Sequence, residues 1–493
     1  MSFSQVRRGR GSLGALAIGM LFRVALRAIF FILEAPEKEV LLLRNLLLLV
    51  AVAMPAFSQT SSKIDPVKYT DTTLENGLRV VIAEDHYAPV YAIAVSYKVG
   101  SKDERPGRTG FAHLFEHMMF KGSENVGPGE HFYTIFTRGG SMNGTTNTDR
   151  TLYFEVLPKN QVDLGLFLEA DRMRSLRVTK ENLDNQRQAV KEERRLSVDN
   201  QPYGQTFEKL DELVYDNFAY HHSVIGSMAD LDAASVEDVQ QFFRTYYAPN
   251  NAVLSLAGDL ETKETLAKVK KYFGGIPRQE APKPVDLAEP KKEGGERRLE
   301  VDDKLARVAR LDIVYRLPDG ASADTRALSV GASILGGGES SRLYQKLVKE
   351  KELASSIQCF ASGREGPSTF RVTAMVPPGK DPKQLESLIS EEIAKFLSEP
   401  VTEKELAKTR TAIRRSTLFP RESVLSTAIS LADETAVYND PNRINSEPEK
   451  RLAVTADEIE AAAKKYLRND NRVVVVTKPA AAAGRPAAPK PGN

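Results

Sequence analysis

The chain has 493 residues, 41% of them hydrophobic and 27% charged, which is enough apolar sequence for more than one buried core and excludes a wholly disordered protein. Its 68 basic and 66 acidic residues leave a formal net charge of +2, so the charge balance gives no indication of a nucleic-acid partner. The single cysteine, Cys359, excludes an intrachain disulfide and a metal site built from several cysteines. It lies in a run that predicts a buried strand.

The N-terminal region carries the pattern of a secretory signal peptide. Arg44 precedes the apolar run 46–53, and small residues follow up to Ser58, after which cleavage is expected. The run is too short to cross a bilayer comfortably, so we expect a chain exported to the periplasm or beyond, with no stable membrane anchor. Residues 1–58 are therefore predicted to be an N-terminal extension and signal peptide.

Residues 1–40 fit this interpretation poorly, because a signal peptide should begin the chain. We therefore expect translation to start near residues 40–41. The alternative is a first membrane helix over 12–35, which would place Arg23 and Arg27 in lipid at a considerable cost in free energy.

The first elements after the signal peptide are predicted strands. Residues 78–82 and 91–97 are rich in β-branched and aromatic residues, and Asn76 and Gly77 supply a turn before the first run. Long helical patterns follow. Strands followed by helices predict an α+β fold in which a sheet packs against helices.

Residues 109–120 contain the motif His-x-x-Glu-His. Apolar residues at helical spacing predict a helix, and residues four apart share a helix face, so His113 and His117 can bind one metal ion. Glu116 lies beside His117, within reach of a water on that metal. The motif is the signature of inverted zincins, in which zinc activates water and a carboxylate takes its proton. The alternative is a surface helix with two solvated histidines, but this helix is apolar almost all round, which predicts burial.

A catalytic zinc needs a third protein ligand and an open position for water. A later predicted helix offers Glu192 and Glu193, of which only one can face the metal because neighbours differ by about 100° around the helix axis. The periodicity favours Glu193, which shares a face with Gln186 and Val190, and leaves Glu192 as the alternative.

Two segments roughly 220 residues apart repeat each other, which predicts an internal duplication. Ser235 and Thr455 each precede acidic first-turn residues of a predicted helix, and a turn and a β-branched strand follow each helix. Thr179 and Thr402 likewise open two long predicted helices.

The duplication sets the predicted domains. A first domain covers 66–275 and a homologous second domain covers 298–477. Residues 276–297 form a linker rich in Pro, Gly, Lys and Glu, and residues 478–493 form a Pro/Ala tail with nothing to bury. The second domain contains no histidine, so it is expected to be inactive.

These residues resemble the pitrilysin/insulinase family of zinc peptidases, which includes the mitochondrial processing peptidases. The resemblance covers about residues 66–477, and beyond the motif it includes the runs 119–123, 139–146 and 151–154. The apolar-x-x-Glu pattern that ends at Glu193 also matches. The resemblance implies that His113, His117 and Glu193 bind one zinc ion per chain.

The resemblance also implies a fold and a binding mode. Each chain of the family has two homologous α+β domains, each an antiparallel-rich sheet packed with helices, and forms half of a clamshell that closes around a peptide. The strand around Asn143 and Gly144 would present its edge to an extended substrate peptide. From the residues alone, an ordinary turn is the alternative at that place.

Two positions depart from the family pattern. Members often carry a second glutamate seven residues before the ligand, where this chain has Gln186. Gln186 would therefore support the metal ligands from behind as a neutral side chain, without the negative charge of a glutamate. The family also holds the substrate backbone with an arginine and a tyrosine seven apart, where this chain has Val348 and Ser355. We therefore expect a heterodimer with a homologous chain that supplies the Arg/Tyr pair.

The sequence thus predicts a zinc-dependent endopeptidase that hydrolyses unfolded peptides or small proteins in a closed chamber, with Glu116 as the general base. The alternative is a non-catalytic structural or assembly subunit of a peptidase-like heterodimer. Retention of the two histidines, the base and the third ligand favours the peptidase. The remaining histidines, His131 among them, are interpreted as loop or packing residues.

Overall fold

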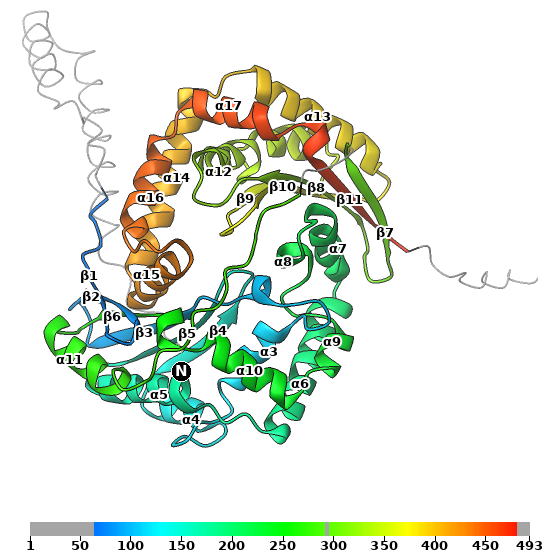
Figure 1. Ribbon diagram of the computed structural model, residues 1–493. Helices are drawn as coiled ribbons and strands as arrows, with labels where there is room; N and C mark the ends of the chain where they lie inside the picture. The colour runs from blue at the N-terminus through cyan, green and yellow to red at the C-terminus, as the bar shows by residue number, and fades with distance from the viewer. Residues whose placement is uncertain (1–63, 291–294, 481–493) are drawn as a thin grey trace, which may run out of the picture. The chain divides into compact units, whose positions relative to one another are not determined.

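The computed structural model describes residues 64–290 and 295–480 (Figure 1). One compact unit starts at Asp65 and contains two sheets with the helices that cover them. The predicted signal peptide over 1–58, residues 291–294 of the predicted linker and most of the predicted tail lie outside the described residues. Across the described ranges, no helix combines the length and the hydropathy that a membrane crossing requires.

The first sheet has six strands in the order β1-β2-β6-β3-β5-β4. β2 and β6 run parallel, whereas every other pair of neighbours is antiparallel. The strands are β1 (Thr70–Thr73), β2 (Arg79–Glu84), β3 (Val90–Tyr97), β4 (Ser141–Thr146), β5 (Thr151–Pro158) and β6 (Ala252–Gly258).

The second sheet has five strands in the order β7-β11-β8-β10-β9, and it also contains one parallel pair, β7 with β11. The strands are β7 (Arg297–Asp303), β8 (Ala309–Leu317), β9 (Ser356–Ser362), β10 (Ser368–Val376) and β11 (Arg472–Pro479). Cys359 is buried in β9, as predicted, and burial raises the pKa of its thiol, which keeps the sulfur neutral.

The helices follow the same division along the chain. Before the second sheet come α3 (Phe111–Met118), α4 (Glu130–Thr137), α5 (Val162–Ser175), α6 (Lys180–Arg194), α7 (Gly204–Val214), α8 (Phe218–His221), α9 (Met228–Asp232), α10 (Val236–Tyr246) and α11 (Thr262–Phe273). The helices that follow the first strands of the second sheet are α12 (Ala323–Gly336), α13 (Pro382–Ser398), α14 (Glu403–Arg421), α15 (Val424–Tyr438), α16 (Arg443–Ala453) and α17 (Ala456–Tyr466).

The internal duplication is visible in the strand order. β7, β11, β8, β10 and β9 follow one another as β2, β6, β3, β5 and β4 do, with the parallel pair at the same place. The predicted α+β fold with two homologous halves is therefore confirmed. The exact domain boundaries, 66–275 and 298–477, stay a prediction.

One side-chain hydrogen bond is repeated in both halves. After α10, the Nδ2 of Asn251 donates to the carbonyl of Tyr246 at 2.9 Å, and after α17 the Nδ2 of Asn471 donates to the carbonyl of Tyr466 at 2.9 Å. Both helices also begin with a reciprocal capping box. The same local chemistry thus ends one helix and starts the following strand in each copy.

The long helices α6 and α14 begin where the sequence predicts. The hydroxyl of Thr179 accepts the N–H of Asn182, and the hydroxyl of Thr402 accepts the N–H of Glu405. Each bond satisfies one of the backbone donors that a helix leaves unpaired at its N-terminus.

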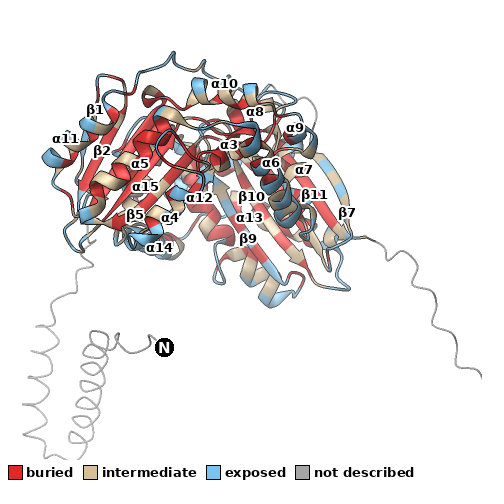
Figure 2. Ribbon diagram, turned by 90° about the horizontal axis from the view of Figure 1, so that it is seen from below, coloured by how far each residue is buried: buried red, intermediate tan, exposed pale blue. Residues whose placement is uncertain are grey.

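Each half also covers the other half's sheet. In α15, Ala428, Leu431 and Ala432 are fully buried against strands of the first sheet, much of which is coloured as buried in Figure 2. In that sheet β3 is buried almost along its whole length. In α7, Leu210 and Val214 pack against β8 and β11 of the second sheet. Because both faces of β3 are covered, its sequence is a continuous hydrophobic run rather than an alternating one.

Candidate active site

The helix that carries the motif, α3, starts at a close approach of two glycines. Gly110 has a φ of 84°, and a Cβ there would lie 2.6 Å from the carbonyl oxygen of Ile225. The carboxylate of Glu104 accepts the N–H of Gly110 at 2.9 Å and the N–H of Ala112 at 2.7 Å. A glutamate therefore satisfies the first backbone donors of α3 and fixes where the helix begins.

The apolar side of α3 is buried, as the sequence predicts. Phe111, Leu114, Phe115 and Met118 are at most 5% exposed. The ring of Phe115 lies 4.1 Å from that of Tyr247, centroid to centroid. The side chains of His113 and His117 are only 12% and 24% exposed, so this segment is not a surface helix with solvated histidines.

The opposite side of α3 brings two histidines to one carboxylate. The Nε2 of His113 lies 3.6 Å from Oε1 of Glu193, and the Nε2 of His117 lies 3.3 Å from Oε2 of Glu193. One donor atom from each of the three residues lies within 4.8 Å of the other two. Tetrahedral zinc with bonds of about 2.0–2.2 Å holds its ligand atoms about 3.4 Å apart, so this donor set fits the ion.

The protonation states of these groups suit a cation. Burial, followed by the nearby His117, lowers the pKa of His113 to about 4, so its imidazole is neutral at pH 7. The hydrogen bond with His117 lowers the pKa of Glu193, so its carboxylate is ionised. Neutral imidazole and ionised carboxylate are the forms that bind metal ions.

Glu116 lies between α3 and the edge strand β4. Its side chain is nearly buried, and the hydroxyl of Thr146 donates to its Oε2 at 2.6 Å. Gly144 faces it so closely that a Cβ on that residue would lie 3.0 Å from both Cγ and Oε1 of Glu116. Burial raises the pKa of Glu116, which makes the carboxylate a stronger proton acceptor.

This contact predicts the effect of Gly144→Ala. The added methyl group would shift the carboxylate of Glu116 by a few tenths of an ångström, whereas misplacement of a reacting group by about 1 Å can cost on the order of 100-fold in rate. We therefore expect kcat for a peptide substrate to fall by up to about 10-fold with zinc content unchanged. Ser141→Ala, an exposed position on the same strand, is the control and should keep the wild-type kcat.

β4 itself is the outermost strand of its sheet. Among the described residues it pairs with β5 on one side only, so its other edge carries main-chain donors and acceptors that an added strand can use. Asn143 and Gly144 lie in the middle of this strand, where the side-chain oxygen of Asn143 accepts the N–H of Gly144 at 2.9 Å. The strand and the general-base candidate thus lie at one place.

Gln186 is buried on α6, two turns before Glu193. The hydrogen bond that the structure gives its amide nitrogen runs to the side-chain oxygen of Asn185. The Nδ1 of His113 is buried without a hydrogen-bond partner among the described residues. The predicted supporting role of Gln186 therefore stays a prediction.

A second group of possible metal ligands, His131, Glu155 and Glu169, is fully buried beside the first sheet. The Nε2 of His131 lies 2.5 Å from Oε1 of Glu155, and Glu169 forms an ion pair with Arg172. The guanidinium of Arg172 lies 4.4 Å from the ring centre of Tyr153. A resident cation, Arg172, therefore already lies beside these two carboxyl groups and pairs with one of them, and we interpret the group as part of the core.

Arg172→Met is expected to lower the free energy of unfolding by about 3–5 kcal/mol, because it leaves buried carboxylates without their cation. Burial raises the pKa of Glu155 and of Glu169 to about 7, so both take up a proton more readily when folded than when unfolded. Protonation would relieve the variant, and the loss should be smaller at pH 5.5 than at pH 8. The free energy of unfolding is measured in urea. Lys180→Met is the control, because the Lys180 side chain is 81% exposed, and it should cost less than about 1 kcal/mol.

Two contacts of the candidate site are not predicted from the sequence. The hydroxyl of Thr146 on Glu116 and the carboxylate of Glu104 at the start of α3 come from segments whose position depends on tertiary packing. The core group of His131 did leave a signal. Strand alternation in β5 places Glu155 on the same face as Tyr153 and Leu157, and a glutamate on an apolar face requires a partner.

Comparisons with known proteins identify relatives of this chain. A family model described as insulinase (peptidase family M16) matches residues 79–227, and one described as the peptidase M16 inactive domain matches residues 233–413. The chain is 29% identical over 414 residues to the zinc protease PqqE of Helicobacter pylori, and this alignment covers 84% of this chain and 93% of that relative.

Two further comparisons extend the likeness. The chain is 26% identical over 412 residues to the probable mitochondrial-processing peptidase subunit beta of Arabidopsis thaliana, covering 81% of this chain and 75% of the relative. The crystal structure of a protease from Helicobacter pylori superimposes with a TM-score of 0.80 at 29% identity, covering 84% of this chain and all of that chain. The protein belongs to the insulinase family of peptidases, family M16.

Proposed function

We propose that this protein is a zinc-dependent endopeptidase. The observation that carries the proposal is the convergence of His113, His117 and Glu193, in which the Nε2 atoms of the two histidines lie 3.6 Å and 3.3 Å from the carboxylate oxygens of Glu193, close to the spacing of ligand atoms around tetrahedral zinc. The zinc proteases among its relatives support the same metal.

The roles of the residues follow from their positions. Bound zinc would lower the pKa of a water molecule and polarise the peptide carbonyl. Glu116 accepts a proton from the attacking water and returns it to the nitrogen of the leaving amine. Thr146 holds the carboxylate of Glu116 in place, and its hydrogen bond to Oε2 leaves Oε1 for this proton transfer.

The open edge of β4 supports an unfolded peptide as substrate. An extended chain can add to this edge through main-chain hydrogen bonds, which depend little on the substrate sequence. Folded proteins rarely offer a free extended segment that could pair with this edge. The proposed substrates are therefore unfolded peptides and small proteins, which the enzyme would cleave inside a closed chamber.

The proposal includes a homologous partner chain. Val348 packs partly buried against the second core, and the backbone N–H of Ser355 donates a hydrogen bond to the carbonyl of Met375. Neither residue has a cationic side chain that could bind substrate carbonyls. A relative is named as a subunit of a processing peptidase. A heterodimer in which the partner supplies an arginine and a tyrosine would complete the site. Export through the predicted signal peptide remains part of the proposal.

A non-catalytic subunit is the second candidate. The match to the inactive-domain model favours it, but that match covers residues 233–413, which include none of the four residues of the proposed centre. The first half retains them all.

Removal and return of zinc tests the proposed function. The purified chain, alone and mixed with its homologous partner, should cleave an unfolded fluorogenic peptide. Dialysis against a chelator should abolish cleavage, and one equivalent of zinc should restore it. Cleavage that persists in metal-free protein would rule out the proposed chemistry, whereas a zinc-loaded complex without cleavage would favour the structural subunit.

A further inference from the structure

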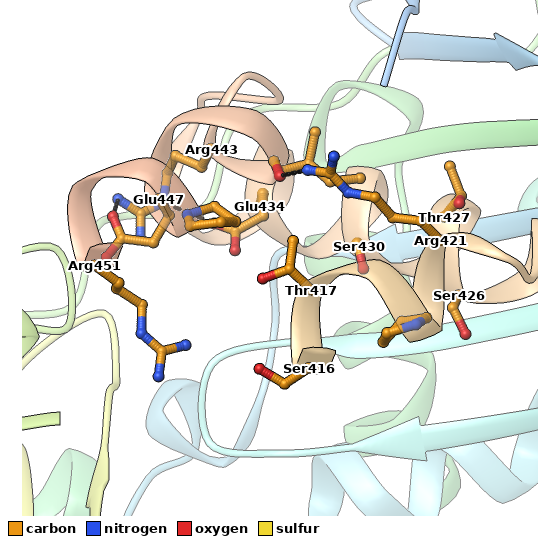
Figure 3. A pocket seen from close by; sticks show the side chains of 13 residues that line it. Ser416, Thr417, Arg421, Ser426, Thr427, Ser430, Glu434, Arg443, Glu447 and Arg451 are labelled. Carbon is orange, nitrogen blue, oxygen red and sulfur yellow. Dashed lines mark hydrogen bonds and ion pairs between the residues drawn. The ribbon is translucent and has the colours of Figure 1, made fainter. Parts of the chain in front are cut away.

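A polar cavity lies in the second half of the chain, between α14, α15 and α16 (Figure 3). Its volume is about 310 Å³, at the lower end of the range for small-molecule sites. None of the residues of the proposed zinc centre lines it. Three arginines do: Arg421, Arg443 and Arg451.

The two glutamates of the cavity are already neutralised. Arg443 forms ion pairs with Glu434 at 2.7 Å and with Glu447 at 3.5 Å. Arg326 forms a second pair with Glu447, also at 2.7 Å. These four charges balance, so Arg421 and Arg451 add two positive charges, and among the described residues neither forms an ion pair with a carboxylate of the cavity.

Arg421 is held by neutral groups. Its Nη1 donates to the carbonyl of Asp65 at 2.6 Å and its Nη2 to the carbonyl of Ile444 at 2.5 Å. Burial lowers the pKa of this guanidinium, and the nearby Glu449 opposes that shift in part. The side chain is thus positioned by neutral groups and forms no ion pair among the described residues.

Arg451 has fewer hydrogen bonds than Arg421, although the nearby Glu447 opposes the effect of burial on its pKa. Its Nε is buried and has no hydrogen-bond partner within the described ranges. Glu447, one turn earlier on α16, pairs with other arginines. Figure 3 shows the guanidinium of Arg451 extending away from Glu447, on the same side as the hydroxyls of Ser416 and Thr417. Burial lowers the pKa of this group also.

An uncompensated cation in a partly buried cavity costs free energy unless an anion joins it. Arginine binds phosphate oxygens through two parallel N–H donors, and hydroxyl groups can add further donors. The hydroxyls of Ser416 and Thr417 already donate to the carbonyl of Ile413, so these donors would come from Ser426, Thr427 and Ser430, which also line the cavity. We propose that the cavity binds a phosphoryl group, as inorganic phosphate or as the phosphate of a small phosphomonoester. This site is separate from the peptidase centre and goes beyond the proposed function.

The position of the cavity indicates what binding would do. α14, α15 and α16 each contribute to its wall, and α15 also packs on β3 and β6 of the first sheet. A bound phosphoryl group would tie these three helices together. It would therefore stabilise the packing of α15 on the sheet that carries β4.

Calorimetric titration of the purified chain tests the proposal with inorganic phosphate, glycerol 2-phosphate and acetate at constant ionic strength. We expect saturable binding of one or both phosphates and no saturable binding of acetate. Stronger binding of glycerol 2-phosphate would identify the phosphomonoester as the ligand, and binding of inorganic phosphate alone would identify the free ion. Equal binding of acetate, or no binding of either phosphate, would overturn the assignment.

The variants locate the site. Arg451→Met should weaken phosphate binding at least about tenfold, because it removes the uncompensated guanidinium. Arg468→Met, an equal charge change at an exposed pair with Asp470, should leave the affinity unchanged. Arg451→Lys keeps the charge without the planar fork and should give an intermediate loss, which serves if the methionine variant does not fold. Unchanged affinity in both Arg451 variants would contradict the proposal, whatever the peptidase activity.

Discussion

Glu116→Gln is expected to lower kcat by about 100- to 10,000-fold, the range that a general base typically contributes. Glutamine has nearly the same shape and keeps an oxygen for the hydroxyl of Thr146 to donate to, but it cannot accept a proton from water. Because Glu116 is not one of the three converging donors, zinc content should stay at one equivalent. Steady-state kinetics with a fluorogenic peptide and metal analysis of the same sample measure both.

Two results would count against this role. A variant with wild-type kcat would mean that another group takes the proton, and a variant without zinc would mean that Glu116 supports the metal rather than the reaction. Glu124→Gln, a 66% exposed position in the same half of the chain, is the matched control and should change neither value.

Glu193→Gln is expected to weaken zinc binding by more than about 100-fold, which is the upper end of the loss known for partners of metal ligands. A neutral amide is a poor zinc ligand, and two imidazoles alone leave the ion under-coordinated. Peptidase activity should fall with the bound zinc and should return partly at high zinc concentration. Competition with a zinc-binding dye measures the affinity.

Glu192→Gln is the control for this variant, one residue away on the same helix. Glu192 is 58% exposed and pairs with Arg195, so its loss should leave zinc affinity within about twofold, as expected for a solvated ion pair. The reverse outcome, with zinc lost in Glu192→Gln and kept in Glu193→Gln, would show that Glu192 and not Glu193 is the third ligand.

The sequence predicts those parts of the site that depend on local periodicity. The spacing of His113 and His117 places both on one side of α3, and the buried residues Leu183 and Val190 on α6 follow the pattern that favours Glu193. In the structure all three donors face one another. Helix faces and caps are local properties, so one sequence is enough to place them.

The parts that depend on distant segments were not predicted. Nothing near Glu116 in the sequence indicates that Thr146 donates to it or that Gly144 lies against it, because β4 reaches α3 through the packing of the sheet. The exchange of α7 and α15 between the two sheets is also a tertiary feature. The sequence pattern of neither helix indicates which sheet it packs against.

The account depends most directly on one metal ion held by three side chains. A crystal of the zinc-loaded protein, measured at the zinc absorption edge, should show a single anomalous peak about 2.0–2.2 Å from His113 Nε2, His117 Nε2 and a carboxylate oxygen of Glu193. A peak elsewhere, or none between these residues with zinc present in excess, would contradict the account.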